Sequence, residues 1–211
     1  MSDMNPRFTL HHAGPSPFAR KVRAVAIELG LESRISLESI IVAPGRENVD
    51  YARNVNPLKR VPSLTLDDGT TLIDSSLICQ YLDELAGNKL IPAQGPRRWD
   101  VLNAMTVANG LMEVAVQLRY ETFARPEEHR WDALVTDLRE RIDNALDWLE
   151  SHAEVISPDE PDLAGIALVC ALGYLDFRYP DIAWRSRCTK LLALHDTLAQ
   201  RPSLLSTQPD A

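Results

Sequence analysis

The sequence predicts two domains: an α/β domain with a four-stranded mixed sheet, followed by an all-α helical bundle. Three observations support this fold class. Short apolar strands alternate with helical patterns before about residue 90, a segment rich in proline and glycine follows, and every later periodic segment is helical. We therefore predict an α/β domain at residues 1–87, a linker at 88–96 and an all-α domain at 97–211.

The elements of the first domain follow the order β-α-β and then β-β-α. In chain order we expect a strand at 8–13, a helix at 17–29, a strand at 35–41, an irregular polar segment at 44–56, a hairpin at 64–73 and a helix at 75–86. Ser16 is a favourable N-cap before Pro17, and Gly30 is a natural helix stop. The turn Asp67-Asp68-Gly69 joins the two strands of the hairpin.

The second domain is helical throughout. We expect helices at 97–125, 127–152, 163–175 and about 185–200. The helix at 163–175 is apolar on all sides and is the expected centre of the bundle, whereas the helix before it carries one apolar stripe. That stripe comprises Trp131, Leu134, Leu138, Ile142, Ala145 and Leu149. Gly110 inside the first helix costs roughly 1 kcal/mol relative to alanine.

The composition is that of a globular protein, with 45% hydrophobic and 25% charged residues in a chain of 211. The formal net charge of −8 argues against a nucleic-acid binder, and any anionic ligand must be attracted by local positive groups. The cysteines Cys79, Cys170 and Cys188 lack metal-ligand spacing and are expected to be buried reduced thiols. The N-terminus lacks a signal pattern, and the apolar run at 163–175 is too short to span a bilayer. We therefore expect a cytoplasmic protein without a membrane partner.

Two segments offer backbone groups that a small peptide can use. The bond between Val61 and Pro62 is a candidate cis peptide, which holds one carbonyl and one N–H facing outward. Asp74 and Ser75 open a helix whose free N–H groups suit a carboxylate. Together these segments predict a site for a ligand that carries both an amine and a carboxylate.

Four motifs in this order resemble the glutathione S-transferase family along nearly the whole chain. They are Ser16-Pro17-Phe18-Ala19-Arg20-Lys21-Val22-Arg23, Asn56-Pro57-Leu58 with Val61-Pro62, Asp74-Ser75-Ser76-Leu77-Ile78-Cys79-Gln80-Tyr81-Leu82, and Ala167-Leu168 with Leu172-Gly173-Tyr174-Leu175-Asp176-Phe177-Arg178. The resemblance implies a thioredoxin-like first domain, glutathione as a co-substrate, no metal, a homodimer and a role in detoxification.

The chain departs from the pattern of that family at two places. Lys59-Arg60 stands where the family often has Gly-Lys, which makes this loop more basic and less flexible. Gly165 stands where the central helix usually has an acidic residue, so the capping box that begins at Asp162 lacks its reciprocal half. That loss is about 1 kcal/mol at most.

Ser16 occupies the position at which the family activates the glutathione sulfur. A hydroxyl donor and a helix N-terminus both favour thiolate over thiol, whose free pKa is about 8.5. A shift of one unit needs about 1.4 kcal/mol. The alternative is that Ser16 only caps the helix, and the two roles can coexist. Adjacent residues of a strand face opposite sides, so at most one of His11 and His12 can approach the sulfur.

The resemblance also implies the other residues of the glutathione site. They are Phe18, Lys59, Arg60, Val61, Pro62, Asp74 and Ser75. Val61 exchanges two backbone hydrogen bonds with the cysteinyl part of glutathione, unless Pro62 ends the loop in trans. Ser75 takes the γ-glutamyl carboxylate and Asp74 the ammonium group, unless the pair only caps the helix. Lys59 or Arg60 pairs with the glycyl carboxylate, or both remain solvated.

The second-substrate pocket is less well specified by the sequence. Family geometry places it between the domains, along the first long helix of the second domain. The candidates by position are Glu113, Gln117, Tyr120 and Phe123, whereas Met112 and Leu118 are expected in the core. Surface positions are expected for Arg20, Lys21, Arg23, His129, His152 and His195.

The leading interpretation is a glutathione transferase, in which the thiolate attacks an electrophilic small molecule or reduces a peroxide. The alternative is a glutathione-binding protein without turnover that sequesters ligands or contacts other proteins. A thiol–disulfide reductase is disfavoured because serine, not cysteine, occupies the reactive position.

Overall fold

The computed structural model describes residues 7–209, which fall into two compact units. Residues 7–89, with residue 209, form one unit, and residues 90–208 form the other. The first unit is α/β and the second is helical.

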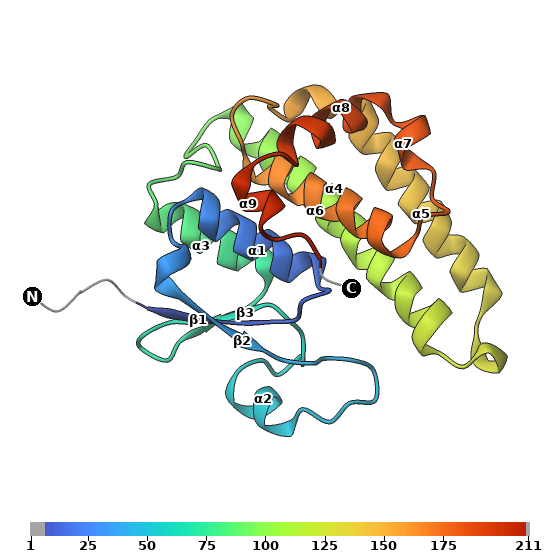
Figure 1. The fold of residues 1–211 in the computed structure, drawn as a ribbon, viewed down its shortest axis with the longest axis horizontal. Coiled ribbons are helices and arrows are strands. Elements are labelled where there is room, and N and C mark those ends of the chain that lie inside the picture. Colours follow the sequence, from blue (N-terminus) through green and yellow to red (C-terminus); the bar gives the residue numbers. More distant parts are fainter. Residues whose placement is uncertain (1–6, 210–211) are drawn as a thin grey trace, which may run out of the picture. The chain divides into compact units, whose positions relative to one another are not determined.

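A mixed β-sheet is the centre of the first unit. The unit contains β1 (Phe8–His12), α1 (Pro17–Glu28), β2 (Ile35–Ser39), α2 (Val49–Asn54), β3 (Ser63–Thr65), β4 (Thr71–Leu72) and α3 (Ser75–Leu85). The four strands lie in the order β2-β1-β3-β4; β1 and β2 are parallel and the other pairs are antiparallel. Figure 1 shows α1 and α3 on one face of this sheet and α2 on the other. The predicted four-stranded mixed sheet is therefore confirmed.

Local sequence signals set the ends of α1 as predicted. The Ser16 hydroxyl oxygen accepts a hydrogen bond from the Ala19 N–H at 3.2 Å, which caps the helix. Gly30 follows the helix with φ of +71°, a left-handed conformation that glycine adopts without a steric penalty. Val22 and Val25 are fully buried on the inner side of the helix.

Two features of the first unit differ from the sequence prediction. The segment expected to be irregular, residues 44–56, contains α2, a helix of six residues in which only Tyr51 is buried. So short a helix shows no apolar period that could have been recognised. Arg20 and Lys21, expected on a solvated face, are 7% and 0% exposed, and both have interaction partners. Their apolar stems allow them to lie within the packed face of α1.

The second unit is a bundle built around α6. It contains α4 (Pro96–Arg119), α5 (Asp132–Ser151), α6 (Leu163–Arg178), α7 (Trp184–Arg187), α8 (Thr189–Leu198) and α9 (Pro202–Leu205). Almost all of α6 is buried, and it packs along α4, so the prediction of a central apolar helix is confirmed.

The start of α6 explains why glycine replaces the acidic residue of the capping box. Asp162 accepts the Gly165 N–H at 2.8 Å, and its other oxygen pairs with Arg97 at 2.8 Å. A Cβ atom at Gly165 would lie 3.0 Å from Leu198 Cδ1 and 3.4 Å from Ile156 Cγ2. A larger side chain here would therefore displace the packed neighbours of the helix.

The connection between α4 and α5 differs from the prediction. The helix expected at 97–125 ends at Arg119 and continues as a π-helical turn over Tyr120–Ala124. The helix expected at 127–152 begins only at Asp132. Trp131 was expected in its buried stripe but is 65% exposed, because the Glu121 carboxylate accepts its N–H at 2.9 Å and holds the chain in a turn.

The C-terminal helical segment also differs from the prediction. The helix expected at 185–200 is divided at Cys188 into α7 and α8. His195 was expected on the surface, but its side chain is only 12% exposed and its ring lies 5.4 Å from that of Trp184. Burial lowers the pKa of His195, as does the charge of Arg185.

The three cysteines are buried and form no disulfide within the described chain, as predicted. The helical stretch Pro96–Ala124 is long and apolar enough to cross a membrane by length and composition alone. The core helix of a soluble protein passes the same test, and 44% of this apolar window is buried.

Candidate functional site

Sheet register brings three connecting segments to the same end of the sheet. β3 starts beside the end of β1, with Ser63 opposite His11, and β4 ends beside the start of β3, with Leu72 opposite Leu64. The segment after β1, the segment before β3 and the segment after β4 therefore leave the sheet together. These segments carry Ser16, Val61-Pro62 and Asp74-Ser75, so the first unit assembles the predicted glutathione-site residues at one location.

Ser16 offers a hydroxyl proton at the N-terminus of α1. Its oxygen already accepts the Ala19 N–H, and a serine hydroxyl retains one O–H donor when its oxygen acts as an acceptor. Pro17 has no N–H, and the Phe18 N–H donates to no acceptor within residues 7–209. One O–H and one N–H, at the positive end of a helix dipole, are thus available to an anion.

Val61 presents an unused stretch of backbone. The Val61-Pro62 peptide bond is cis, which confirms the predicted isomer and rules out the trans alternative. Neither the N–H nor the carbonyl of Val61 forms a backbone hydrogen bond to another described residue. An extended peptide can therefore pair with both groups as an added strand does.

A buried polar network holds the residue before Val61. The carbonyl of Arg60 accepts hydrogen bonds from the Tyr51 hydroxyl at 2.8 Å and from Asn56 Nδ2 at 2.8 Å. Both donors also reach Ser63 Oγ, at 3.1 and 3.0 Å, and Asn56 Oδ1 accepts the Leu58 N–H at 2.9 Å. The Arg60 carbonyl is thereby fixed on the inner side of the loop, and the backbone groups of Val61 remain open.

The sequence interpretation missed this supporting role. Tyr51 and Asn56 are 6% and 0% exposed although they belong to a segment expected to be irregular and polar. The available signal was Asn56 before Pro57, because an asparagine side chain commonly bonds the backbone two residues later. Nothing local to Tyr51 indicated its partner nine residues away.

His11 and His12 lie on opposite sides of β1, as expected for adjacent strand residues. His11 contacts Glu38 at 3.3 Å and Thr65 at 3.1 Å, and its ring lies 5.7 Å from that of Tyr51. Burial lowers the pKa of His11, against the opposing charge of Glu38. Burial also lowers the pKa of His12, and the charge of Arg23 on α1 adds to that effect.

Asp74 and Ser75 open α3 with one backbone donor unused. Asp74 is the N-cap, and its Oδ1 accepts the N–H of Ser76 at 2.7 Å and of Leu77 at 3.4 Å. The Ser75 N–H has no acceptor within the described part of the chain. Asp74 therefore caps the helix and leaves both its second oxygen and the Ser75 N–H for a ligand, although Ser75 itself is only 3% exposed.

Lys59 and Arg60 are exposed, and neither pairs with a carboxylate of residues 7–209. Lys59 has φ of +51°, a conformation that favours glycine, and it is the position where the resembled family often has glycine. The loop therefore keeps the backbone shape associated with glycine and gains a positive side chain.

The candidate second-substrate residues lie on α4 and the π-helical turn after it. Glu113, Gln117, Tyr120 and Phe123 are all exposed, whereas Met112 and Leu118 are fully buried as predicted. No group of three or more His, Cys, Asp or Glu side chains that could hold a metal ion occurs within residues 7–209.

Known proteins resemble this chain over both units. The family profile of the glutathione S-transferase N-terminal domain matches residues 10–90, and that of the glutathione S-transferase C-terminal domain matches residues 132–197. The uncharacterized GST-like protein YibF of Escherichia coli K12 is 32% identical over 203 residues, which cover 92% of this chain and 95% of YibF.

Two solved structures from Pseudomonas fluorescens Pf-5, both of a glutathione transferase family member, are also similar. The one with bound glutathione is 39% identical, with a TM-score of 0.90, and the match covers 97% of this chain and 100% of that chain. The one with bound S-(propanoic acid)-glutathione is 38% identical, with a TM-score of 0.88 and coverage of 96% and 100%.

Proposed function

Because the chain belongs to the glutathione S-transferase family, we propose that it binds glutathione at this end of the sheet and activates the thiol for attack on an electrophilic small molecule. The observation that carries the proposal is the Ser16 hydroxyl. Its oxygen is occupied by the Ala19 N–H, and its proton remains available to a sulfur anion.

The three parts of glutathione have distinct partners in this proposal. The cysteinyl backbone pairs with the open N–H and carbonyl of Val61. The γ-glutamyl carboxylate accepts the Ser75 N–H, and the second oxygen of Asp74 takes the γ-glutamyl ammonium. Lys59 or Arg60 pairs with the glycyl carboxylate, since both are exposed cations in the loop that carries Val61.

Chemistry depends on holding the sulfur as a thiolate. A hydroxyl donor from Ser16 and the N–H of Phe18 both stabilise S⁻ relative to SH, and the α1 dipole acts in the same direction. The thiolate then attacks the electrophilic carbon, a carbon–sulfur bond forms, and the leaving group departs with its electron pair. Glutathione and S-(propanoic acid)-glutathione bound to the relatives from Pseudomonas fluorescens support this assignment of the ligand.

We also propose a homodimer that uses α3. Leu77 and Leu85 on this helix are 47% and 41% exposed, although they are large apolar side chains. A second copy of the chain would remove this apolar surface from water. A molecular mass of one chain, measured by sedimentation in solution, would contradict the dimer.

The thiolate role is tested with Ser16→Gly. Glycine costs only a few tenths of a kcal/mol at an N-cap, so this variant removes the hydroxyl and nearly preserves the helix. We expect the bound thiol of wild type to titrate below about 8.5 by thiolate absorbance, and the variant to return toward that value. At a pH below both values, turnover with chlorodinitrobenzene should fall about tenfold for each unit by which the thiol pKa rises, because the fraction of thiolate falls by the same factor.

Glutathione affinity, measured by titration calorimetry, serves as the control and should change less than about threefold in Ser16→Gly. Ser16→Thr should restore much of the turnover because it returns a hydroxyl. If wild type binds glutathione but leaves its thiol pKa unchanged and turns over no electrophile, the non-enzymatic glutathione-binding alternative replaces this proposal.

A further inference from the structure

Two arginines at helix ends of the second unit pair with neither a carboxylate nor a backbone carbonyl of residues 7–209. Arg98 and Arg130 also lack a carboxylate, but they donate to the carbonyls of Pro92 and Arg125. Arg119 ends α4 and Arg178 ends α6, and no carboxylate of residues 7–209 lies within 4.0 Å of either guanidinium. Other arginines of this unit do pair with carboxylates: Arg97, Arg125, Arg139, Arg141, Arg185 and Arg187. Acidic residues outnumber basic ones 30 to 22 in the chain, so the absence of carboxylate partners at Arg119 and Arg178 does not reflect a shortage of acidic residues.

Both guanidinium groups are stacked on aromatic rings. Arg119 Cζ lies 3.4 Å from the centroid of the Phe123 ring, and Arg178 Cζ lies 3.8 Å from that of Phe177. Stacking occupies the flat face of a guanidinium and leaves the in-plane N–H groups available as donors. The Nε of Arg178 is moreover buried without a hydrogen-bond partner in the described chain, a state that a bound acceptor would relieve.

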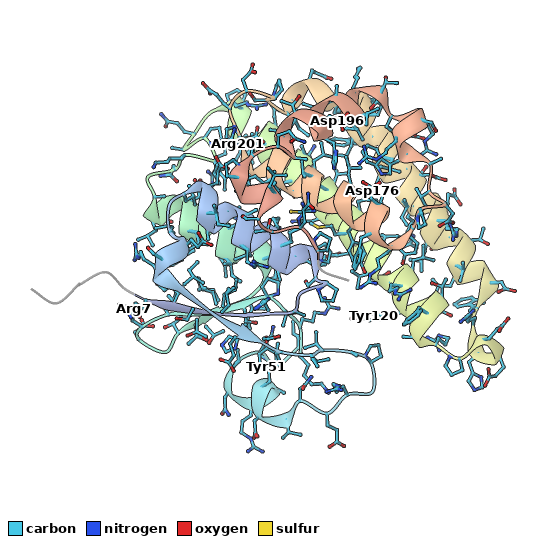
Figure 2. The ribbon with its side chains drawn as sticks, in the orientation of Figure 1. Arg7, Tyr51, Tyr120, Asp176, Asp196 and Arg201 are labelled. Carbon is cyan, nitrogen blue, oxygen red and sulfur yellow. The ribbon has the colours of Figure 1, made fainter. Side chains whose placement is uncertain are left out.

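Two tyrosines join the arginines in one cluster. Burial raises the pKa of Tyr174; the positive charges of Arg178 and Arg119 act in the opposite direction, and Tyr120 raises the pKa further. Arg119 and Arg178 are the last residues of α4 and α6, which pack along each other, and the charges of both arginines act on Tyr174. Figure 2 labels Tyr120 at the carboxyl end of α4. The Tyr174 hydroxyl already shares a hydrogen bond with Arg178. Because a guanidinium can only donate, the hydroxyl oxygen is the acceptor in that bond and its own proton remains available to a ligand.

We propose that Arg119, Arg178 and Tyr174 bind a carboxylate of the second substrate, so that the protein favours anionic electrophiles. A planar guanidinium accommodates a carboxylate with two parallel hydrogen bonds, and the aromatic rings beside it suit an apolar body attached to that carboxylate. The reaction assigned to the substrate rests on the proposed function, whereas anion binding by this cluster does not. Tyr120, a second-substrate candidate by sequence position, belongs to the same cluster.

Chlorodinitrobenzoate is a probe that carries both a carboxylate and an electrophilic ring carbon. With chlorodinitrobenzoate, the glutathione thiolate attacks the ring carbon that carries chlorine. A carbon–sulfur bond forms, the carbon–chlorine bond breaks, chloride leaves with its electron pair, and the thiol proton passes to solvent. The carboxylate stays ionised and does not react, so it acts only as a handle for binding.

The first experiment measures binding without chemistry. Dinitrobenzoate and dinitrobenzamide, which lack chlorine, are titrated calorimetrically into wild type, Arg119→Met, Arg178→Met and Arg141→Met. We expect wild type to bind the acid about tenfold more tightly than the amide, a difference of about 1.4 kcal/mol. Arg119→Met and Arg178→Met should abolish that preference. Arg141→Met, an exposed α5 residue paired with Asp137, should retain it.

Arg119→Lys provides a variant that keeps the charge without the planar fork, and it should retain only part of the preference. Thermal unfolding of each variant identifies any that fails to fold, and Arg119→Lys then decides the question. Equal binding of acid and amide by wild type, or equal loss of preference in Arg141→Met, overturns the proposal.

The second experiment compares turnover of chlorodinitrobenzoate and chlorodinitrobenzamide, each divided by its uncatalysed rate with glutathione. We expect kcat/KM to favour the acid in wild type, and Arg119→Met to lower the acid value about tenfold with little change for the amide. Turnover of both compounds without preference leaves the proposed function intact and overturns the anion site. Preferential binding of the acid without any turnover supports the anion site and contradicts the proposed function.

Discussion

The support beneath the Arg60 carbonyl gives the sharpest prediction about the glutathione-binding loop. Tyr51 and Asn56 both donate to this single carbonyl at 2.8 Å, so each can partly compensate for loss of the other. We therefore expect the variants Tyr51→Phe and Asn56→Ala to be coupled. The measured quantity is the free energy of unfolding of each single variant and of the double variant.

The magnitudes follow from the bonds that each substitution removes. Tyr51→Phe removes bonds to Arg60 and Ser63 but leaves the carbonyl paired with Asn56, so we expect a loss of about 1 kcal/mol. Asn56→Ala removes three bonds from a side chain that is 0% exposed, so we expect about 2–3 kcal/mol. The double variant also leaves the carbonyl without either donor, which should add about 1–2 kcal/mol beyond the sum.

Denaturant titration in urea measures all three losses, and titration calorimetry with glutathione gives a second readout. Asn56→Ala should weaken glutathione binding about tenfold, because the backbone of Val61 is no longer positioned. Leu31→Ala is the matched control, since Leu31 is also buried in the first unit but precedes the opposite end of the sheet. The strand β2 that follows it begins beside the start of β1, whereas the site lies beyond the end of β1. It should lose about 2–4 kcal/mol of stability but leave glutathione affinity within about threefold.

Strict additivity of Tyr51→Phe and Asn56→Ala would refute the shared-carbonyl reasoning. Equal weakening of glutathione binding by Leu31→Ala and Asn56→Ala would show that general destabilisation, not the position of the loop, controls affinity.

Three further predictions concern stability. Gly110→Ala should stabilise the protein by about 0.5–1 kcal/mol, because the new Cβ has no atom within 4 Å. Gly165→Ala should destabilise the protein, because its Cβ would lie 3.0 Å from Leu198 Cδ1. Melting temperatures of the two variants that shift in the same direction would contradict this contrast. Asp162→Ala should lose about 1–2 kcal/mol through the helix cap, and Asp162→Asn, which keeps an acceptor for the Gly165 N–H, should lose less in urea titration. Burial lowers the folded-state pKa of His195, so the unfolded chain binds more protons and stability should fall as pH drops below about 6.5. His195→Gln should flatten this fall relative to wild type, and unfolding curves with equal pH slopes would exclude a contribution from His195.

Features governed by neighbours in sequence were predictable. Ser16 before Pro17 and Gly30 after the helix set the ends of α1, and Asp74 set the start of α3. The turn Asp67-Asp68-Gly69 identified the hairpin for the same reason. Segments without a local period were not predictable, and α2 is the clearest case, because only one of its six residues is buried.

Burial and partner choice required the tertiary structure. Lys21 is 0% exposed and His195 is largely buried, although neither residue type indicates an interior position. Trp131 shows the reverse, because the bond of its N–H to Glu121, ten residues earlier, replaces the first turn of the expected helix.

The sequence by itself determined the two-domain class, the helix caps and the position of Ser16, since these depend on residues a few positions apart. Only the tertiary structure decided that Tyr51 and Asn56 support the Arg60 carbonyl, and that Arg119 and Arg178 remain without carboxylates beside Tyr174. The physical reason is that hydrogen bonds, ion pairs and desolvation act over a few ångströms in space, whatever the separation along the chain.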